Sequence, residues 1–223
     1  MRLKICGFIF DIDGTLVDSN ELHVDSWDRA FRHFGKHFSR EALRAQIGKG
    51  SDQYLPEFLT PEEIDRFGKQ LDEYRSEIFR KECLPSVRPF PKVRELFQRI
   101  HDEKRPIILA SSGKKEDPKY YIEDLLSIED LIAGYTCADD ADHSKPAPDI
   151  FTAALEKLNS IPPEETVTIG DTRFDIEAAA KARLRTIAVL CGGSAENVLR
   201  RAGAIAIYQD PADILAHYDT LVG

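Results

Sequence analysis

Six short apolar runs recur along the chain and constrain its fold more than any other feature. Most are near-continuous rather than alternating with polar residues, which is typical of strands covered on both faces. The runs are residues 3–10, 106–111, 132–138, 166–170, 186–191 and 204–208. Helix-like segments separate most of them, at about 91–104, 115–126, 149–159, 173–183, 194–201 and 211–218. Strands that alternate with helices predict an α/β fold, a Rossmann-like open parallel sheet with helices on both faces.

The segment from about residue 19 to 86 breaks this rhythm, because it contains no convincing strand. Within residues 61–82, apolar side chains recur at spacings of three and four, which predicts one face of a helix. These positions are Ile64, Phe67, Leu71, Tyr74 and Ile78. Thr60, followed by Pro61 and Glu63, has the order of a helix N-terminus with a capping box.

A second helix is expected at residues 21–34, and the single tryptophan, Trp27, lies on its apolar side. Trp27 is therefore expected in a core rather than at a binding surface. Both helices belong to a predicted helical bundle inserted after the first strand. Residues 17–20 and the proline-rich residues 83–91 are the expected connectors.

The chain is therefore predicted to form two domains. A catalytic α/β core takes residues 1–18 and 87–223, and a helical cap domain takes residues 19–86. Ligands of open parallel sheets bind beyond the carboxyl ends of the strands. The cap follows the first strand at such an end, so we expect it to lie over the binding pocket as a lid.

Charge and cysteine content disfavour several function classes. The formal net charge of -9 argues against binding to nucleic acid or an anionic membrane, because both require basic surfaces. None of the four cysteines has the C-x-x-C spacing of a zinc site, and small buried side chains are expected rather than a disulfide framework. The run at residues 3–10 is shorter than a signal peptide requires, and no run is long enough to span a bilayer. A cytoplasmic protein is expected.

Polar residues follow the strand-like runs at the edge where a ligand is expected. Parallel strands bring these distant positions to one edge of the sheet. They are Asp11 and Asp13 after the first run, Ser111, Ser112 and Gly113 after the second, Lys145 in the loop after the third, and Asp171 with Asp175 after the fourth. Asp11 and Asp13 are two residues apart, so both can address one point from an extended chain.

The chemistry of this set indicates phosphoryl transfer. Asp11, Asp13 and Asp171 form a hard oxygen cluster without histidine or cysteine, which suits Mg²⁺ better than Zn²⁺. Ser111, the backbone N–H groups after it and the cation of Lys145 suit a phosphate group. One carboxylate can then attack phosphorus while another handles protons. Ordinary alternatives are a polar strand-end turn for the first acids, a solvated loop position for the lysine, and a first-turn helix acid for the last aspartate.

Four stretches, DIDGTLVDS, ASSG, SKPAPDIF and GDTRFDIEAA, resemble in their order and spacing the four motifs of the haloacid dehalogenase-like phosphohydrolase superfamily. The resemblance is closest to the helical-capped branch, which includes phosphoglycolate phosphatase-like enzymes and β-phosphoglucomutase. It extends over almost the whole chain, since the inserted bundle and the later strands also fit. It implies a Mg²⁺-dependent phosphatase that hydrolyses a small phosphorylated metabolite through a phosphoaspartyl intermediate.

The resemblance also implies roles for individual residues. Asp11 is the expected nucleophile, and Asp13 is expected to protonate the leaving oxygen and then to activate the hydrolytic water. The residues expected to bind the phosphoryl group are Ser111, Ser112, Gly113 and Lys145. Those expected at the metal are Asp11, Asp13 through its carbonyl, Asp171 directly, and Asp175 in support of the metal or of Lys145.

Two cap residues are candidates for substrate specificity. Lys49, in IGKGSDQYL, resembles the position of a loop that dips toward the substrate in capped relatives; it either neutralises a substrate anion or is a solvated lysine. His23, in ELHVDSW, falls where some relatives place a histidine near the active site, and its alternative is a surface or hinge histidine. CGGS at residues 191–194 resembles an anion-binding loop, but a turn is favoured.

Other functions remain alternatives. A β-phosphoglucomutase-like mutase needs an extra basic anchor in the cap; Ser51 lies near the position of the expected arginine, and Lys49 is the available substitute. Dehalogenation is disfavoured because Asp13 is present, and phosphonate cleavage needs a Schiff-base lysine, for which Lys49 is the only candidate. A non-catalytic phosphate-binding protein would keep the same pocket. Neither the physiological substrate nor the oligomeric state can be read from the sequence.

Overall fold

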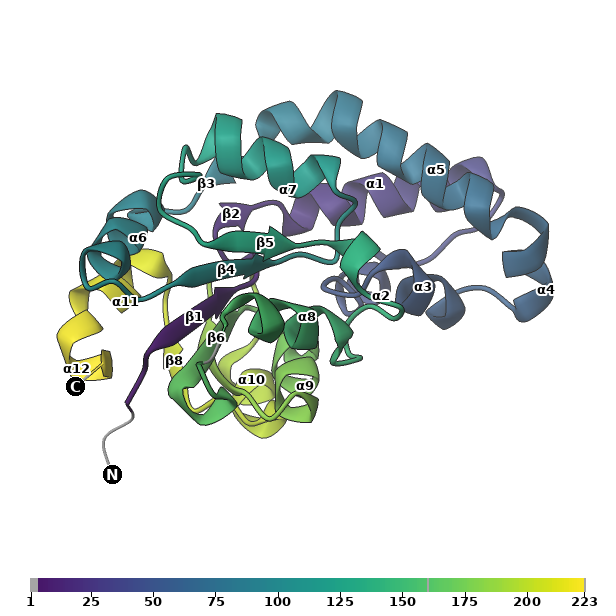
Figure 1. The fold of residues 1–223 in the computed structure, drawn as a ribbon. Coiled ribbons are helices and arrows are strands. Elements are labelled where there is room, and N and C mark those ends of the chain that lie inside the picture. Colours follow the sequence, from purple (N-terminus) through teal and green to yellow (C-terminus); the bar gives the residue numbers. More distant parts are fainter. Residues whose placement is uncertain (1–3, 160, 223) are drawn as a thin grey trace.

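The computed structural model describes residues 4–159 and 161–222, with a six-stranded parallel sheet at the centre (Figure 1). The strands are β1 (Gly7–Phe10), β4 (Ile107–Ala110), β5 (Gly134–Thr136), β6 (Thr166–Gly170), β7 (Arg185–Val189) and β8 (Ala206–Tyr208). Their order across the sheet is β5-β4-β1-β6-β7-β8. Phe8 of β1 is in register with Ile107 of β4 on one side and Val167 of β6 on the other. The end of β1 is therefore a topological switch point, where ligands of such sheets bind.

Each predicted apolar run overlaps one of these strands, which confirms the predicted α/β fold; residue 3 of the first run lies outside the described residues. The helical elements around the sheet are α6 (Val93–Asp102), α7 (Glu116–Tyr120), η5 (Tyr121–Leu125), η6 (Ala138–Asp140), α8 (Asp149–Lys157), η7 (Pro163–Glu165), α9 (Arg173–Lys181), α10 (Glu196–Ala202), α11 (Pro211–Ala216) and α12 (Tyr218–Val222). Figure 1 shows α8 and α9 on one side of the sheet, and α6 and α11 on the other.

Successive side chains of β1 pack into different apolar clusters, as expected for a strand covered on both faces. Phe10 packs against Phe97 of α6, with ring centroids 4.8 Å apart. Ile9 belongs to a second cluster, which includes Phe151 of α8. Phe10 and Ile9 are both buried, and burying such a side chain stabilises the fold by about 1.5–3 kcal/mol.

Helical elements fill residues 20–86, which are called the helical segment below. They are α1 (Asn20–His33), α2 (Arg40–Arg44), α3 (Ser51–Tyr54), η1 (Leu55–Glu57), α4 (Pro61–Glu63), η2 (Ile64–Gly68), α5 (Lys69–Ile78), η3 (Phe79–Cys83) and η4 (Leu84–Ser86). The segment has an apolar cluster of its own, in which the rings of Trp27 and Tyr54 stack 4.4 Å apart. Trp27 is buried, as predicted. The division of the chain into the two predicted domains stays a prediction.

The predicted helix at residues 61–82 begins with the predicted capping box. The hydroxyl of Thr60 accepts a hydrogen bond from the N–H of Glu63 (3.4 Å), and the Glu63 carboxylate accepts one from the N–H of Thr60 (3.2 Å). α4, η2, α5 and η3 then follow one another without a break, and η2 and η3 are π-helical. The helix is therefore present with two wider turns that the spacing of its apolar residues did not reveal.

The two connectors pair with each other in an antiparallel connector ribbon. Its strands are β2 (Val17–Asp18) and β3 (Arg88–Pro89), with Val17 opposite Pro89 and Asp18 opposite Arg88. The helical segment thus leaves and rejoins the sheet at one place.

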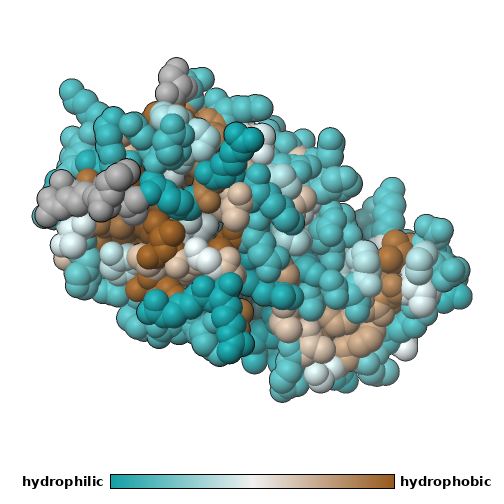
Figure 2. Space-filling model, turned by 90° about the horizontal axis from the view of Figure 1, so that it is seen from below, coloured by the Kyte–Doolittle hydropathy of each residue, from teal (hydrophilic) through white to brown (hydrophobic). Residues whose placement is uncertain are grey.

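The surface in Figure 2 is mostly hydrophilic, with hydrophobic residues in separate patches. Among the described residues, Val198 (39%) and Ile205 (42%) are the large hydrophobic side chains that are exposed. All four cysteines are free; Cys83 and Cys137 are buried, as predicted, whereas Cys6 and Cys191 are half-buried. No helix within residues 4–159 and 161–222 combines the length and the apolar character needed to cross a membrane.

Candidate active site

Asp11 is the first residue after β1, and both oxygens of its carboxylate accept hydrogen bonds. Its N–H donates to the carbonyl of Ile169 in β6 (2.9 Å), which fixes the backbone at the sheet edge. Lys145 Nζ donates to Asp11 Oδ1 at 2.5 Å, and Thr15 Oγ1 donates to Oδ2 at 3.0 Å. Burial raises the pKa of Asp11 to about 7; Lys145 opposes this rise and the carboxylate of Asp175 adds to it.

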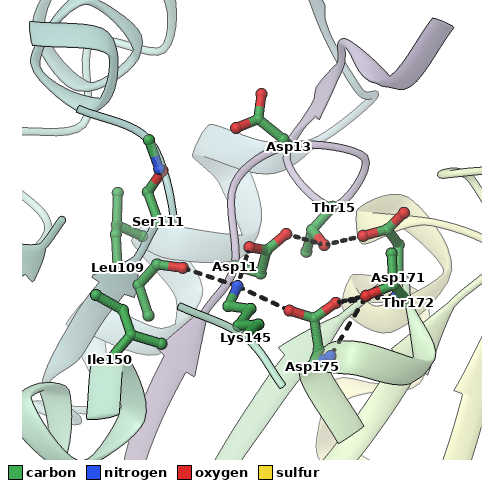
Figure 3. A network of polar contacts seen from close by, with 12 residues as sticks. Asp11, Asp13, Thr15, Leu109, Ser111, Lys145, Ile150, Asp171, Thr172 and Asp175 are labelled. Atoms are coloured by element: carbon green, nitrogen blue, oxygen red, sulfur yellow. Dashed lines mark hydrogen bonds and ion pairs between the residues drawn. The ribbon is translucent and has the colours of Figure 1, made fainter. Parts of the chain in front are cut away.

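Lys145 joins two of the predicted acids, although it lies far from both in sequence (Figure 3). Its side chain is 1% exposed, and its Nζ forms ion pairs with Asp11 (2.5 Å) and Asp175 (2.8 Å). It also donates a hydrogen bond to the carbonyl of Ala110 (3.2 Å). Burial opposes the charged form, but the carboxylates of Asp11 and Asp175 outweigh it and raise the pKa of Lys145. Lys145 is therefore a buried ammonium group and not a solvated loop lysine.

Asp175 is held toward Lys145 by the start of α9. Thr172 is the N-cap residue. Its N–H (3.0 Å) and its hydroxyl (2.6 Å) donate hydrogen bonds to Asp175 Oδ2. The Thr172 hydroxyl in turn accepts a hydrogen bond from the N–H of Asp175 (3.3 Å). This capping box occupies Oδ2 and leaves Oδ1 for Lys145.

Asp171 follows β6 and completes a group of three buried carboxylates, called the acidic group below. One oxygen from each of Asp11, Asp171 and Asp175 lies within 4.8 Å of the others. Asn20 Nδ2 donates to Asp171 Oδ2 at 2.8 Å, and Thr15 Oγ1 lies 3.4 Å from Oδ1. Burial raises the pKa of Asp171 well above its usual range, and the carboxylates of Asp175 and Asp11 add to the rise.

The acidic group fits a divalent cation. Its three carboxylates face one buried ammonium group, Lys145, so further positive charge is needed for all of them to ionise. All the donors are oxygens, which Mg²⁺ prefers. Two glycines make close approach to this group possible: a Cβ added to Gly192 would lie 1.8 Å from Asp171 Oδ2, and one added to Gly14 would lie 2.4 Å from it. The residues present therefore fit Mg²⁺ in charge and donor type.

Asp13 lies apart from the acidic group in Figure 3 and contacts the helical segment instead. Its Oδ1 accepts hydrogen bonds from Ser19 Oγ (2.6 Å), His23 Nε2 (3.0 Å) and the Tyr121 hydroxyl (3.2 Å). Burial opposes ionisation, but the contact with His23 and the hydrogen bonds from Ser19 and Tyr121 outweigh it, and the pKa of Asp13 falls to about 2. Asp13 is therefore ionised in this arrangement.

His23 reaches Asp13 from α1 in the helical segment. Its ring stacks on Phe79 with centroids 4.0 Å apart, and Arg75 Nη2 lies 2.5 Å from its Nδ1. Its Nδ1 faces Arg75 and its Nε2 faces Asp13, so both ring nitrogens have polar partners. The structure thus places His23 against the predicted acid–base residue.

The loop after β4 forms one wall of a pocket. Ser111 is buried, and its Oγ accepts a hydrogen bond from the N–H of Gly113 (3.0 Å). Ser112 Oγ is also buried and has no hydrogen-bond partner among the residues that the structure describes. The pocket has a volume of about 290 Å³, and its lining includes Asp11, Asp13, Ser112 and Gly113 together with His23, Lys49 and Arg75 of the helical segment.

Lys49 reaches this pocket with its charge already paired. Its Nζ lies 2.6 Å from the Glu57 carboxylate and 4.8 Å from the centre of the Phe174 ring, and its side chain is 7% exposed. The loop that carries it contacts the Lys145 loop, because the N–H of Gly50 donates to Ser144 Oγ at 2.9 Å. Lys49 is therefore not a solvated lysine, but Glu57 offsets its charge.

Six residues of this site were not identified from the sequence: Thr15, Ser19, Asn20, Arg75, Tyr121 and Thr172. Thr15 and Ser19 lie inside the DIDGTLVDS motif and Thr172 lies inside GDTRFDIEAA, so the motifs were the available signal for these three. The contacts of Asn20 and Arg75 depend on how the helical segment lies over the sheet, and that placement leaves no local pattern in the sequence.

The chain is similar to known hydrolases and phosphatases over most of its length. The family described as haloacid dehalogenase-like hydrolase matches residues 8–189. A phosphorylated carbohydrates phosphatase from Thermotoga maritima is 27% identical over 212 residues, which cover 93% of this chain and 95% of the relative. A pyrophosphatase PpaX from Oceanobacillus iheyensis is 27% identical over 229 residues, which cover 99% of this chain and 98% of the relative. The crystal structure of a hydrolase from Pseudomonas syringae matches with a TM-score of 0.87 and 28% identity, covering 97% of this chain and 99% of that chain.

These matches confirm the resemblance inferred from the four motifs and the expectation of an enzyme. They extend over the helical segment as well as the sheet. The chain belongs to the haloacid dehalogenase-like hydrolase family.

Proposed function

We propose that the protein is a Mg²⁺-dependent phosphatase that hydrolyses a small phosphorylated metabolite through a phosphoaspartyl intermediate. The observation that carries the proposal is the buried network of Asp11, Lys145 and Asp175 beside Asp171, at the switch point of the sheet. The relatives of this chain include a phosphatase of phosphorylated carbohydrates and a pyrophosphatase, both of which act on phosphate groups.

Asp11 is the proposed nucleophile. Lys145 and Thr15 hold its carboxylate by one oxygen each, which fixes the orientation from which it approaches phosphorus. A new bond forms between a carboxylate oxygen of Asp11 and phosphorus, and the bond from phosphorus to the leaving oxygen breaks. Water then attacks the same phosphorus, which releases Asp11 and inorganic phosphate.

Asp13 is the proposed acid and base. Its low pKa keeps it ionised, and the second step requires the ionised carboxylate to accept a proton from the attacking water. The first step needs the protonated form, which donates to the leaving oxygen. The hydrogen bonds from Ser19, His23 and Tyr121 stabilise the ionised form, so substrate binding must loosen at least one of them before that step.

Asp11, Asp171 and Asp175, together with the backbone carbonyl of Asp13, are the residues proposed to hold Mg²⁺. When bound, Mg²⁺ offsets the negative charge of the carboxylates and of the phosphoryl group. Asn20 donates to Asp171 from the helical segment, and the Thr15 hydroxyl lies between Asp171 and Asp11, so both orient Asp171. Asp175 has both oxygens engaged, by Lys145 and Thr172, so its proposed part is mainly to position Lys145.

Ser111, Ser112, Gly113 and Lys145 are the residues proposed to bind the phosphoryl group. The buried Ser112 Oγ is available for this, since it has no hydrogen-bond partner among the described residues and its residue lines the pocket. Lys145 supplies the positive charge next to Asp11. Donors arranged in advance around a transferring group are typically the largest contribution to such catalysis.

Each alternative function needs a different set of residues from the proposed phosphatase. A mutase needs a free cation to hold a second phosphate. Lys49, the substitute that the sequence offered, is paired with Glu57, so a mutase would have to use another cation of the helical segment. A non-catalytic phosphate-binding protein would not need the acid–base residue Asp13. Mutase activity and pure binding are therefore outcomes that the experiment must separate. A cytoplasmic location, and the absence of nucleic-acid and membrane partners, stay predictions.

The test is phosphate release from sugar phosphates, phosphoglycolate, nucleotides and pyrophosphate, with Mg²⁺ and with EDTA. We expect release with Mg²⁺ and none with EDTA. Asp11→Asn should abolish turnover and keep the fold, because it is nearly isosteric and removes one charge from the acidic group. Asp130→Asn is the matched control, since its carboxylate is exposed, pairs with Arg94 and lies outside the four motifs. Normal turnover by Asp11→Asn would refute the nucleophile, and binding without release would favour the non-catalytic alternative.

A further inference from the structure

Arg75 differs from the other basic residues that line the pocket. Lys49 pairs with Glu57 at 2.6 Å, and Lys114 pairs with Asp72 at 3.0 Å. Arg75 has no carboxylate within 4.0 Å in the part of the chain that the structure describes. It is therefore the pocket cation whose charge is not offset by a neighbouring acid.

The surroundings of Arg75 fix its guanidinium while leaving part of it unused. The group lies over the rings of Trp27 (4.9 Å to the centroid) and Phe79 (5.3 Å). One terminal nitrogen donates to His23 Nδ1 at 2.5 Å. Its Nε is buried and has no hydrogen-bond partner among the described residues. A buried donor without a partner is rare in proteins. Arg75 as a whole is only partly buried and lines the pocket, so its guanidinium can meet an acceptor that enters there.

The acids around the pocket make such a cation important for an anionic ligand. Asp13, Asp52, Asp117 and Asp142 also line the pocket, and the formal charge of the chain is -9. A ligand group with a negative charge would be repelled unless a local cation compensates. The planar fork of arginine also matches carboxylate and phosphate oxygens better than a lysine does.

We propose, on the basis of the proposed phosphatase function, that Arg75 binds a second anionic group of the substrate, so that the preferred substrates are compact phosphate esters with a carboxylate or a further phosphoryl group. Compactness follows from the geometry. A single imidazole ring, with hydrogen bonds of 2.5 and 3.0 Å on either side, separates Arg75 from Asp13, the residue next to the reacting phosphoryl group. The pocket volume of about 290 Å³ also suits a small ligand.

The experiment compares esters that differ only in the second group. Phosphoglycolate carries a carboxylate, ethane-1,2-diyl bisphosphate carries a phosphoryl group, and 2-hydroxyethyl phosphate carries a neutral hydroxyl. The readout is the ratio of kcat/KM for each anionic ester to kcat/KM for the neutral one. Effects that Arg75 has on Asp13 through His23 act on all three esters and cancel in this ratio.

Wild-type protein is expected to prefer at least one anionic ester. Arg75→Gln should lower that preference by about 10- to 100-fold, the range expected for losing a charge-assisted hydrogen bond. Arg75→Lys should keep part of it, because charge remains but the fork is lost. The control is Lys114→Gln, which removes a cation of the same pocket that already has a partner, and it should leave the ratio within about threefold of wild type. Which ratio collapses identifies the second group as carboxylate or phosphoryl.

Three results would overturn the inference. They are a wild-type ratio near one for both anionic esters, a ratio that Arg75→Gln leaves unchanged, and an equal loss in Lys114→Gln, which would indicate a general field effect. If Arg75→Gln fails to fold, the wild-type ratio and Arg75→Lys still decide. Failure of the proposed function is distinguishable: no ester, including p-nitrophenyl phosphate, would then release phosphate with Mg²⁺, whereas failure of the inference alone leaves 2-hydroxyethyl phosphate hydrolysed.

Discussion

Replacing Lys145 by methionine is expected to destabilise the metal-free protein strongly, because it leaves buried carboxylates without their cation. The side chain is 1% exposed, and the two carboxylates that it pairs with, Asp11 and Asp175, are also buried. Removing one partner of a buried ion pair costs about 3–5 kcal/mol. For a chain of 223 residues, each kcal/mol lowers Tm by about 2–4 °C, so the expected fall is about 6–20 °C.

The sign of the pH dependence follows from the pKa of Asp11. Burial raises this pKa to about 7, above the unfolded value, and loss of Lys145 raises it further. When the pKa of a carboxyl group is higher in the folded state than in the unfolded state, the folded state loses stability as the pH rises to the folded pKa. The lost stability returns as the pH falls and the group becomes protonated. The gap in Tm between wild type and Lys145→Met should therefore be large at about pH 8.5 and narrow toward about pH 6.

Thermal unfolding followed by circular dichroism in EDTA measures these quantities. The double variant Asp11→Asn with Lys145→Met should recover part of the lost stability, since one of the stranded charges is gone. A Tm for Lys145→Met within about 2 °C of wild type at pH 8.5 would contradict the reasoning. So would a gap that widens as the pH falls, because the destabilisation would then not come from carboxylate charge.

Two further changes test the surroundings of the network. Gly192→Ala should raise the Mg²⁺ concentration for half-maximal activity by about 10- to 100-fold, because its Cβ would lie 1.8 Å from Asp171 Oδ2 and the carboxylate must move. Gly193→Ala places a Cβ that meets nothing within 4 Å on a backbone with φ +91°, so it should lower Tm through strain and leave that concentration unchanged. Equal effects on the Mg²⁺ concentration would argue against displacement of Asp171. Ser144→Ala removes the acceptor for the N–H of Gly50, so it should raise KM by about 2- to 10-fold and make amide hydrogen exchange at Gly50 faster. Unchanged exchange at Gly50 would show that this hydrogen bond does not hold the loop that carries Lys49.

The sheet was predictable because its strands are buried on both faces, which leaves uninterrupted apolar runs. Local signals at helix ends were equally readable: Thr60 and Glu63 form the predicted capping box, since its partners are three residues apart. Lys145 and Asp175 were grouped with Asp11 correctly in space, because parallel strands deliver their following loops to one edge. Where topology alone gathers residues, sequence reasoning was sufficient.

The resemblance pointed to His23, but the individual contacts between the helical segment and the sheet were not predictable. The hydrogen bonds from His23 to Asp13 and from Arg75 to His23 depend on how two packed layers are placed, and helical periodicity only indicates which face is apolar. The strands β2 and β3 have two residues each, too few for an alternating pattern to be recognised. The π-helical turns η2 and η3 escaped for a similar reason, since a single wider turn hardly disturbs a spacing of three and four.

The connector ribbon restricts how the helical segment can move. Val17 pairs with Pro89 across the ribbon, and it also bridges to Asp13 on its other side, where the N–H of Gly14 donates to its carbonyl (2.9 Å). The two chain crossings are thus tied to each other and to the turn that carries Asp13, so neither can swing alone. A movement of the helical segment that admits a substrate would therefore also move the carboxylate of Asp13. A substitution at Val17 would disturb both movements together.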